Sequence, residues 1–160
     1  MFLTHAASLA LTGALIALAW IDLRTFRLPD SITLPLTATG LAMNVLVLHT
    51  PWVSLIGALA GYLAFVAIEI GYRQLRGRNG LGRGDAKLLA AGGAWCGAWL
   101  LPGMVMVATL SALVFVGAVA LVRRRLPDTG RALAFGPWLA LGIFAGWIYR
   151  IYGPGLYPVL

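Results

Sequence analysis

Two aspartates are the residues in this sequence best suited to chemistry. Asp22 ends the first long apolar run, and Asp85 follows Gly82-Arg83-Gly84, where an arginine-rich segment meets another apolar run. Ionisable side chains at the ends of membrane helices are costly and commonly mark functional sites. Two carboxylates that share one proton can hydrolyse a peptide bond, because one activates water while the protonated partner polarises the carbonyl group. Asp22 and Asp85 therefore predict a catalytic dyad of the aspartic protease type.

The composition predicts an integral-membrane protein. Of the 160 residues, 61% are hydrophobic and 11% are charged, whereas about 25% of a soluble domain is charged. The net charge of +7 comes from short basic segments between apolar runs, which membrane topology explains better than nucleic-acid binding does. No linker, repeat or low-complexity tract divides the chain, so residues 1–160 are expected to form one all-α membrane domain. The single cysteine, Cys96, is expected to pack in the core.

Six apolar segments are long enough to be considered membrane helices, since a crossing needs about 20 apolar residues. They are Phe2–Ile21, Ser31–His49, Trp52–Tyr72, Asp85–Leu101, Pro102–Val122 and Ala132–Ile151. The alternative that the first segment is a cleaved signal peptide rests on Ala17-Leu18-Ala19. No Lys or Arg precedes that tripeptide, which argues against it.

The connections between these segments alternate in charge. Arginines and Lys87 gather in the connections after the first, third and fifth segments, and Arg150 alone lies on the opposite side. By the positive-inside rule the basic connections face the cytoplasm and both termini face outward. Asp22 and Asp85 are then both expected near the cytoplasmic boundary, where antiparallel packing of the first and fourth segments would let them meet.

The residues around Asp85 predict an open approach to its carboxylate. Gly82 and Gly84 carry no side chain, so an extended peptide could lie beside Asp85; the alternative is a flexible loop ended by a helix N-cap. Asp85 begins a helix, where the dipole favours an anion, and Asp22 ends one, where the dipole does not. We therefore expect Asp22 to be the more readily protonated member of the pair.

The remaining acids have simpler interpretations. Asp30 precedes the second segment and is expected to be its N-cap. Asp128 lies in a Pro-Asp-Thr-Gly turn. Glu69 could pair with Arg73 one helical turn away, or line a wet cavity.

Three other features complete the set of candidate residues. Lys87 is expected either to tune the dyad electrostatically or to anchor the fourth segment at the membrane face. His5 and His49 lie near the outer boundary without partners at ligand-like spacing, so neither a metal site nor a cofactor is expected. Phe135-Gly136-Pro137 is expected to kink or start the sixth helix, for packing or for a substrate groove.

Three segments together resemble the signatures of the type IV prepilin peptidases. Ile21-Asp22 with Leu28-Pro29-Asp30-Ser31-Ile32-Thr33-Leu34-Pro35 is similar to the family's first signature, and residues 77–89, from Gly77 to Leu89, are similar to the second. The stretch Ala134-Phe135-Gly136-Pro137-Trp138-Leu139-Ala140-Leu141-Gly142 resembles the late Phe-Gly-Pro segment. Asn79 and Leu81 stand where the second signature often has Glu and Met.

The resemblance implies a GxGD-class aspartic endopeptidase of the bacterial inner membrane. Such enzymes cleave the leader peptides of type IV prepilins and type II secretion pseudopilins after a glycine, on the cytoplasmic side. The family's two catalytic aspartates fall on Asp22 and Asp85, and precursor proteins and membrane lipid are the implied partners. Larger members also carry an N-terminal domain with paired CxxC motifs and methylate the new N-terminus. Only 21 residues precede Asp22, so a short form without N-methyltransferase activity is expected.

Two rival functions stay open on the sequence alone. A small proton-coupled transporter could use Asp22 and Asp85 as relay groups. A non-catalytic assembly factor of a pilus or secretion system could keep the same fold. Cleavage of a prepilin-like substrate distinguishes the peptidase from both.

Overall fold

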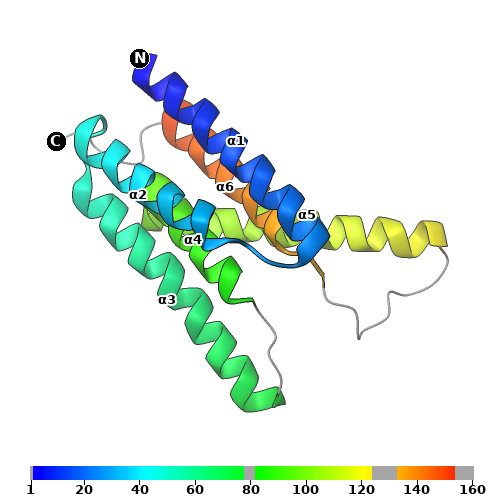
Figure 1. The fold of residues 1–160 in the computed structure, drawn as a ribbon. Coiled ribbons are helices and arrows are strands. Elements are labelled where there is room, and N and C mark those ends of the chain that lie inside the picture. The colour runs from blue at the N-terminus through cyan, green and yellow to red at the C-terminus, as the bar shows by residue number, and fades with distance from the viewer. Residues whose placement is uncertain (1, 78–81, 124–132, 154–160) are drawn as a thin grey trace.

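The computed structural model describes residues 2–77, 82–123 and 133–153, and these residues form helices without a strand (Figure 1). The helices are α1 (Phe2–Thr25), α2 (Asp30–Leu46), α3 (Pro51–Arg76), α4 (Arg83–Cys96), the short 3-10 helix η1 (Ala98–Leu100), α5 (Leu101–Arg123) and α6 (Gly136–Tyr152). The all-α prediction is confirmed.

The six predicted segments each correspond to one α-helix, with several boundaries displaced by a few residues, and two of these displacements have a clear physical cause. The fourth helix ends at Cys96 instead of Leu101, because Gly97 adopts a left-handed φ of 85° that ends the helix. The sixth begins at Gly136, after Phe135 and with Pro137 in its first turn, where a proline fits without losing a hydrogen bond.

Three of the helical segments in the described part of the chain are long and apolar enough to cross a membrane: Leu3–Thr25, Pro51–Leu75 and Ala98–Arg123. The helices α2, α4 and α6 are shorter, with 17, 14 and 17 residues. At 1.5 Å per residue α4 extends only about 21 Å. The number of six crossings therefore stays a prediction.

The helix that carries Asp85, α4, lies at the centre of the bundle and packs against α2, α3 and α6. Its residues from Leu88 to Cys96 are all buried. Small residues permit this close packing: a methyl group added to Gly57 of α3 or to Gly93 of α4 would overlap the carbonyl oxygen of the other. Contact between the backbones of α3 and α4 therefore fixes the position of the helix that presents Asp85.

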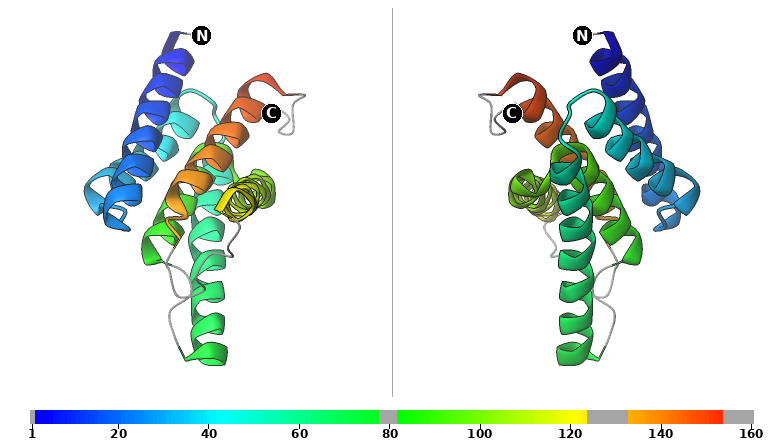
Figure 2. Two further views of the ribbon diagram at one scale, coloured as in Figure 1. Left: turned by 90° about the vertical axis from the view of Figure 1, so that its right-hand side faces the viewer. Right: turned by 90° about the vertical axis from the view of Figure 1, so that its left-hand side faces the viewer.

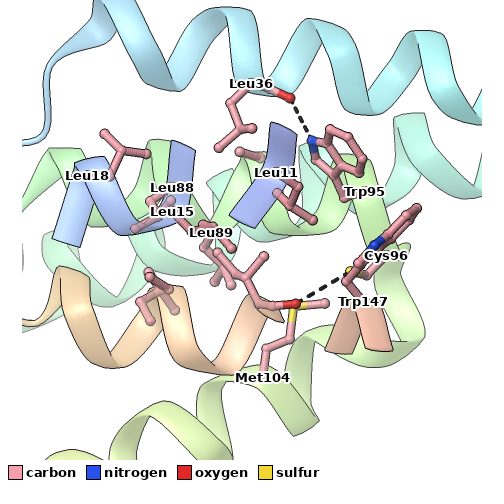
Figure 3. Close-up of a cluster of buried hydrophobic side chains, with 14 of the residues drawn as sticks. Leu11, Leu15, Leu18, Leu36, Leu88, Leu89, Trp95, Cys96, Met104 and Trp147 are labelled. Carbon is pink, nitrogen blue, oxygen red and sulfur yellow. Dashed lines mark hydrogen bonds between the residues drawn. The ribbon is translucent and has the colours of Figure 1, made fainter. Parts of the chain in front are cut away.

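The apolar core joins α4 to α1, α2 and α6 (Figure 3). Leu11 and Leu18 of α1 are fully buried in it, so α1 packs as part of the bundle. Trp95 and Trp147 pack edge to face, with ring centroids 5.0 Å apart. The Trp95 indole donates a hydrogen bond to the Leu36 carbonyl at 2.8 Å. Cys96 is fully buried here, as expected.

One helix departs from this arrangement. The first turns of α5 pack on α6, where Met104 lies against Gly142 and Gly146. The contact with α6 continues to Phe115, whose ring centroid lies 5.1 Å from that of Trp138. Beyond Phe115 α5 runs away from the other helices, as Figures 1 and 2 show. Its later residues, Leu113 and Val114 among them, are largely exposed. In a membrane this apolar face is suited to contact lipid.

Candidate active site

Asp22 lies in the last turn of α1, and its carboxylate is buried against the start of α6. Only 6% of the residue is exposed. The backbone N–H of Gly136 donates a hydrogen bond to Asp22 Oδ2 at 2.9 Å. A Cβ atom at position 136 would lie 2.6 Å from that oxygen, so only glycine leaves the carboxylate in this position. The Phe-Gly-Pro segment thus holds Asp22, a role that neither the packing nor the groove interpretation of the sequence foresaw.

Asp85 lies in the first turn of α4, which begins after Gly82. Burial of the half-exposed carboxyl group and the negative charge of Asp22 raise the pKa of Asp85 to about 6, although a backbone hydrogen bond from Gly82 acts in the opposite direction. The expectation that the helix N-terminus makes Asp85 the favoured anion is therefore wrong. Loss of hydration outweighs the helix dipole at this position.

The two aspartates face one pocket of about 280 Å³, here called the dyad pocket. Its lining comes from the end of α1, the α1–α2 connection, and the start of α4: Asp22, Phe26, Arg27, Leu28, Asp30, Gly82, Arg83, Gly84, Asp85 and Lys87. The pocket therefore brings together both predicted catalytic residues and all three residues predicted to support them.

The pairing does not arise from side-by-side packing of α1 and α4, which the antiparallel arrangement would require. Instead, α1 packs mainly on α6, while α4 packs on α2, α3 and α6. The two aspartates meet because α6 contacts both helices and because the short α1–α2 connection crosses the start of α4. Phe26 begins that connection with a left-handed φ of 52°, a conformation that is rare for a bulky residue and turns the chain sharply.

The two glycines before Asp85 have different surroundings. A Cβ on Gly82 would meet mainly the Asp85 carboxylate, 3.3 Å away, so this glycine does leave space beside the acid. A Cβ on Gly84 would lie 3.0 Å from Cβ of Leu28. The space at Gly84 is therefore filled by this chain's own leucine, which corrects the expectation that it is open to a peptide.

An ion pair closes one side of the dyad pocket. Lys87 Nζ donates to both carboxylate oxygens of Asp30, at 2.6 and 2.7 Å. The expected N-cap role of Asp30 is wrong: α2 begins at Asp30, its N-cap is Pro29, and no side-chain capping bond forms there. A hydrogen bond from a charged ammonium group to a carboxylate is stronger than one from a neutral backbone N–H group. Lys87 is therefore a better partner for Asp30 than the first N–H groups of α2. Lys87 thus connects α4 to the start of α2.

A second ion pair holds the segment before Asp85. Glu69 of α3 is 7% exposed, and its Oε1 lies 3.5 Å from Arg83 Nε. The expected partner was Arg73, one turn further along the same helix. The folded chain instead brings Arg83 from α4 to this buried carboxylate. Sequence spacing within one helix could not reveal a contact between two helices.

Asp128, Asn79 and Leu81 lie outside the described residues. Within the described ranges, no group of three or more His, Cys, Asp or Glu side chains is placed to hold a metal ion. The dyad pocket presents the carboxyl groups of Asp22 and Asp85 together with backbone N–H donors, while the third carboxylate in its lining, Asp30, is paired with Lys87.

Comparison with known proteins agrees with this constellation. The model of the type IV leader peptidase family matches residues 9–119, a range that includes Asp22 and Asp85. The chain belongs to this family. No solved structure matches the chain.

Curated relatives cover most of this chain. A "prepilin leader peptidase/N-methyltransferase" of Pectobacterium carotovorum subsp. carotovorum is 45% identical over 88% of this chain and 52% of its own length. Proteins with the same name from Aeromonas salmonicida (strain A449) and Escherichia coli (strain K12) are 40% and 42% identical, over 94% and 82% of this chain and 50% and 60% of their own lengths. The chain thus spans between half and three fifths of the length of these relatives.

Proposed function

We propose that this leader peptidase family member is a membrane aspartic endopeptidase that removes the leader peptide of type IV prepilins or type II secretion pseudopilins. The observation that carries the proposal is the convergence of Asp22 and Asp85, from two separate helices, on one pocket. The names of the relatives supply the substrate class. The proposal concerns peptide cleavage alone and treats the chain as one membrane domain.

The chemistry follows from two carboxyl groups that hold one proton between them. The ionised carboxylate takes a proton from water as the water oxygen attacks the scissile carbonyl carbon. The protonated carboxyl group donates its proton to the carbonyl oxygen, which would otherwise become an oxyanion. Collapse of the tetrahedral intermediate breaks the C–N bond, and the leaving amine takes the proton that water gave to the first carboxylate. A hydroxyl group of the intermediate returns a proton to the second carboxylate as the product acid forms. The pair of carboxyl groups then holds one proton, as it did at the start.

The surroundings of the pair suggest which group has which task. Asp85 keeps its proton up to a pH near its raised pKa of about 6, so it is suited to act as the acid. Asp22 accepts the Gly136 N–H bond, which fixes the orientation of its carboxylate and suits it to hold the attacking water as the base. This assignment is the reverse of the one that helix dipoles alone predict. Close carboxyl groups titrate as a pair, so the assignment describes the dominant protonation state.

The location is part of the proposal. The basic segments that adjoin Asp22 and Asp85 favour a cytoplasmic position for the dyad pocket under the positive-inside rule. The protein would then lie in the bacterial inner membrane with lipid as its surroundings. A precursor anchored in the same membrane could present its leader peptide to the pocket from the cytoplasm.

The test is cleavage of a prepilin-like precursor by the purified wild-type protein and by Asp22→Asn and Asp85→Asn. Each substitution removes one carboxyl group while keeping its size, so each is expected to lower kcat at least about a thousandfold. Both variants must elute and unfold like the wild type. Normal processing by either variant would contradict the dyad. Proton-coupled transport by the wild type without proteolysis would support the rival transporter.

A further inference from the structure

A groove with a volume of about 620 Å³ lies between α1 and α2 and is here called the α1–α2 groove. Its walls are apolar except at Ser31 and Thr39, and Trp95 of α4 contributes to its lining. On α2 the lining runs from Ser31 to Val47, a length of about 24 Å at 1.5 Å per residue. This length is similar to the hydrocarbon thickness of a bilayer, about 30 Å.

The groove and the dyad pocket adjoin at the start of α2. Asp30 lines the dyad pocket, and the next two residues, Ser31 and Ile32, line the groove. A molecule that lies along the groove therefore reaches the two aspartates at one end. The smaller groove between α1 and α6 has less than half this volume, about 300 Å³.

The end of the groove near the aspartates carries a hydrogen-bond acceptor. Pro35 lies inside α2 and has no N–H, so it cannot return the helical hydrogen bond to the Ser31 carbonyl. Ser31 and Pro35 both line the groove. The first N–H groups of any α-helix lack acceptors within their own helix. The start of a peptide helix could therefore donate to this carbonyl, whereas a lipid acyl chain has no donor to offer.

The wall formed by α1 can accept a close helical partner. Ala6, Ala10 and Ala14 follow one another at four-residue spacing along the groove. Small side chains at this spacing let a second helix approach closely in a membrane. The wall thus has the shape that a helix needs, while the acceptor at Ser31 fits the polar start of that helix.

We propose that the α1–α2 groove binds the apolar membrane helix of the precursor, with the N-terminal end of that helix at Ser31. This inference rests on the proposed function. A peptide bond just before the start of the bound helix would lie at the dyad pocket, so the groove sets which bond is cleaved. The groove is thus a docking site for a membrane helix and not for a soluble peptide.

The first test fills the groove. Ala42 is exposed on its α2 wall, and Ala118 is exposed on α5, away from it. Ala42→Trp is expected to raise KM for a full-length precursor roughly tenfold with kcat within about twofold, because ground-state and transition-state binding weaken together. For a short peptide that contains the leader and cleavage site but ends before the apolar segment, KM should not change. Ala118→Trp is the matched control and should alter neither substrate.

Two results of this experiment would overturn the proposal. One is an unchanged KM of Ala42→Trp for the full-length precursor. The other is a rise in KM for Leu141→Trp, which fills the α1–α6 groove instead. Unchanged kinetics with the short peptide show that the Ala42→Trp protein is folded, so a rise in KM with the precursor reports on docking.

The second test does not depend on cleavage. A photo-activated benzoylphenylalanine at position 10 of the Asp85→Asn protein should cross-link a labelled precursor in detergent and in vesicles, and excess unlabelled precursor should compete. The same probe at position 118 should not. If the wild type leaves the precursor uncut but position 10 cross-links it, docking holds and the proposed cleavage fails. Adducts with lipid alone at position 10 would overturn the docking assignment.

Discussion

The two ends of α4 both carry polar groups, but the bundle treats them in opposite ways. At the C-terminal end a closed network joins four helices, formed by the side chains of Asn44, Thr50, Ser54 and Arg150 and the carbonyls of Ala94 and Trp95. At the N-terminal end Asp85 faces a pocket instead. At the C-terminal end the polar groups bond to one another, whereas at the N-terminal end the Asp85 carboxyl group faces a pocket.

The closed network gives a structural role to Arg150, which the sequence analysis placed apart from the basic connections. Arg150 Nη1 donates to the Trp95 carbonyl at 2.8 Å, and Asn44 Nδ2 donates to the Ala94 carbonyl at 2.9 Å. These carbonyls belong to the last turn of α4, where a helix lacks its own donors and where its dipole attracts a cation. Arg150 thus has a structural role that is unrelated to topology signals.

The contrast between the two ends of α4 distinguishes polar groups with a structural role from those with a functional role. No buried side-chain nitrogen or oxygen atom of the described residues lacks a hydrogen bond, so burial of polar groups alone does not identify the site. What distinguishes the Asp85 end is a pocket together with a carboxyl group whose pKa is raised to about 6. Perturbed titration inside a cavity is the mark of a functional site. Substitutions at either end of α4, with activity and stability measured separately, test this division.

Apart from substitution of the two aspartates themselves, the largest effect is expected for Gly136→Ala. The added Cβ would lie 2.6 Å from Asp22 Oδ2, so the carboxylate must move. A displacement of about 1 Å lowers turnover roughly a hundredfold, while the Arg150 network stays intact. Steady-state cleavage of the precursor measures the loss. Gly117→Ala is the control, because nothing lies within 4 Å of a Cβ at that helical position. A Gly136→Ala enzyme with normal kcat would show that the Gly136 contact does not position Asp22.

The second effect concerns the closed end. Asn44 is fully buried, and Asn44→Leu removes its hydrogen bonds to the end of α4 and to Arg150. We expect a loss of about 2 kcal/mol in the free energy of unfolding, with kcat of the folded enzyme within about twofold of the wild type. Unfolding in detergent measures the loss of stability. Cleavage assayed under conditions below the unfolding transition measures kcat.

Ser111→Ala is the control for this change, because its hydroxyl group donates only to carbonyls of its own helix, Val107 and Ala108. It should alter stability by less than about 0.5 kcal/mol. A large fall in kcat for Asn44→Leu with unchanged stability would mean that the two ends of α4 are coupled and that the division drawn above is wrong.

The third effect is a pH dependence. The raised pKa of Asp85, about 6, means that its carboxyl group is protonated below that pH and ionised above it. Cleavage needs one proton on the pair, so kcat/KM should fall roughly tenfold per unit as the pH rises well above 6. The midpoint of unfolding, measured over the same range, identifies any loss caused by denaturation. A profile that stays flat up to about pH 8 would contradict the assignment of Asp85 as the acid.

Sequence reasoning predicted the order of the helices and the two aspartates, because apolar length and charge pattern are local properties of the chain. It placed Asp22 and Asp85 near one face from the alternation of basic connections. It could not predict that α6 rather than α4 holds Asp22, since the Gly136 N–H is a backbone donor that no side-chain pattern reveals.

The errors share a physical cause. Asp30 and Glu69 were assigned partners within their own helices, but Lys87 and Arg83 of α4 reach them in the folded chain. Gly84 was expected to leave space for a substrate, yet Leu28 fills it. The protonation order was argued from helix dipoles, whereas burial dominates at Asp85. Each error concerns a contact between elements, which spacing along one element does not determine.

The smallest effect is expected for the Lys87–Asp30 pair at the rim of the dyad pocket. Both side chains are partly exposed, at 32% and 54%, so solvent screens the pair and its removal should change stability by less than about 1 kcal/mol. If Lys87 only ties α4 to α2, Lys87→Met and Asp30→Asn should each lower kcat/KM by roughly two- to fivefold, and the double variant should lose no more than either single one.

The alternative role of Lys87, electrostatic tuning of the dyad, gives a different pattern in the same cycle. Removal of a positive charge near Asp85 would then shift the pH profile of Lys87→Met to higher pH, because a nearby cation stabilises the ionised carboxylate. Asp30→Asn would shift the profile the opposite way, since it leaves that cation without its carboxylate partner. If Lys87→Met and Asp30→Asn lower kcat/KM to a similar extent without moving the pH profile, Lys87 is an anchor. If they move the pH profile in opposite directions, Lys87 tunes the charge of the dyad. The anchor is expected, because Lys87 Nζ makes both of its recorded hydrogen bonds to Asp30.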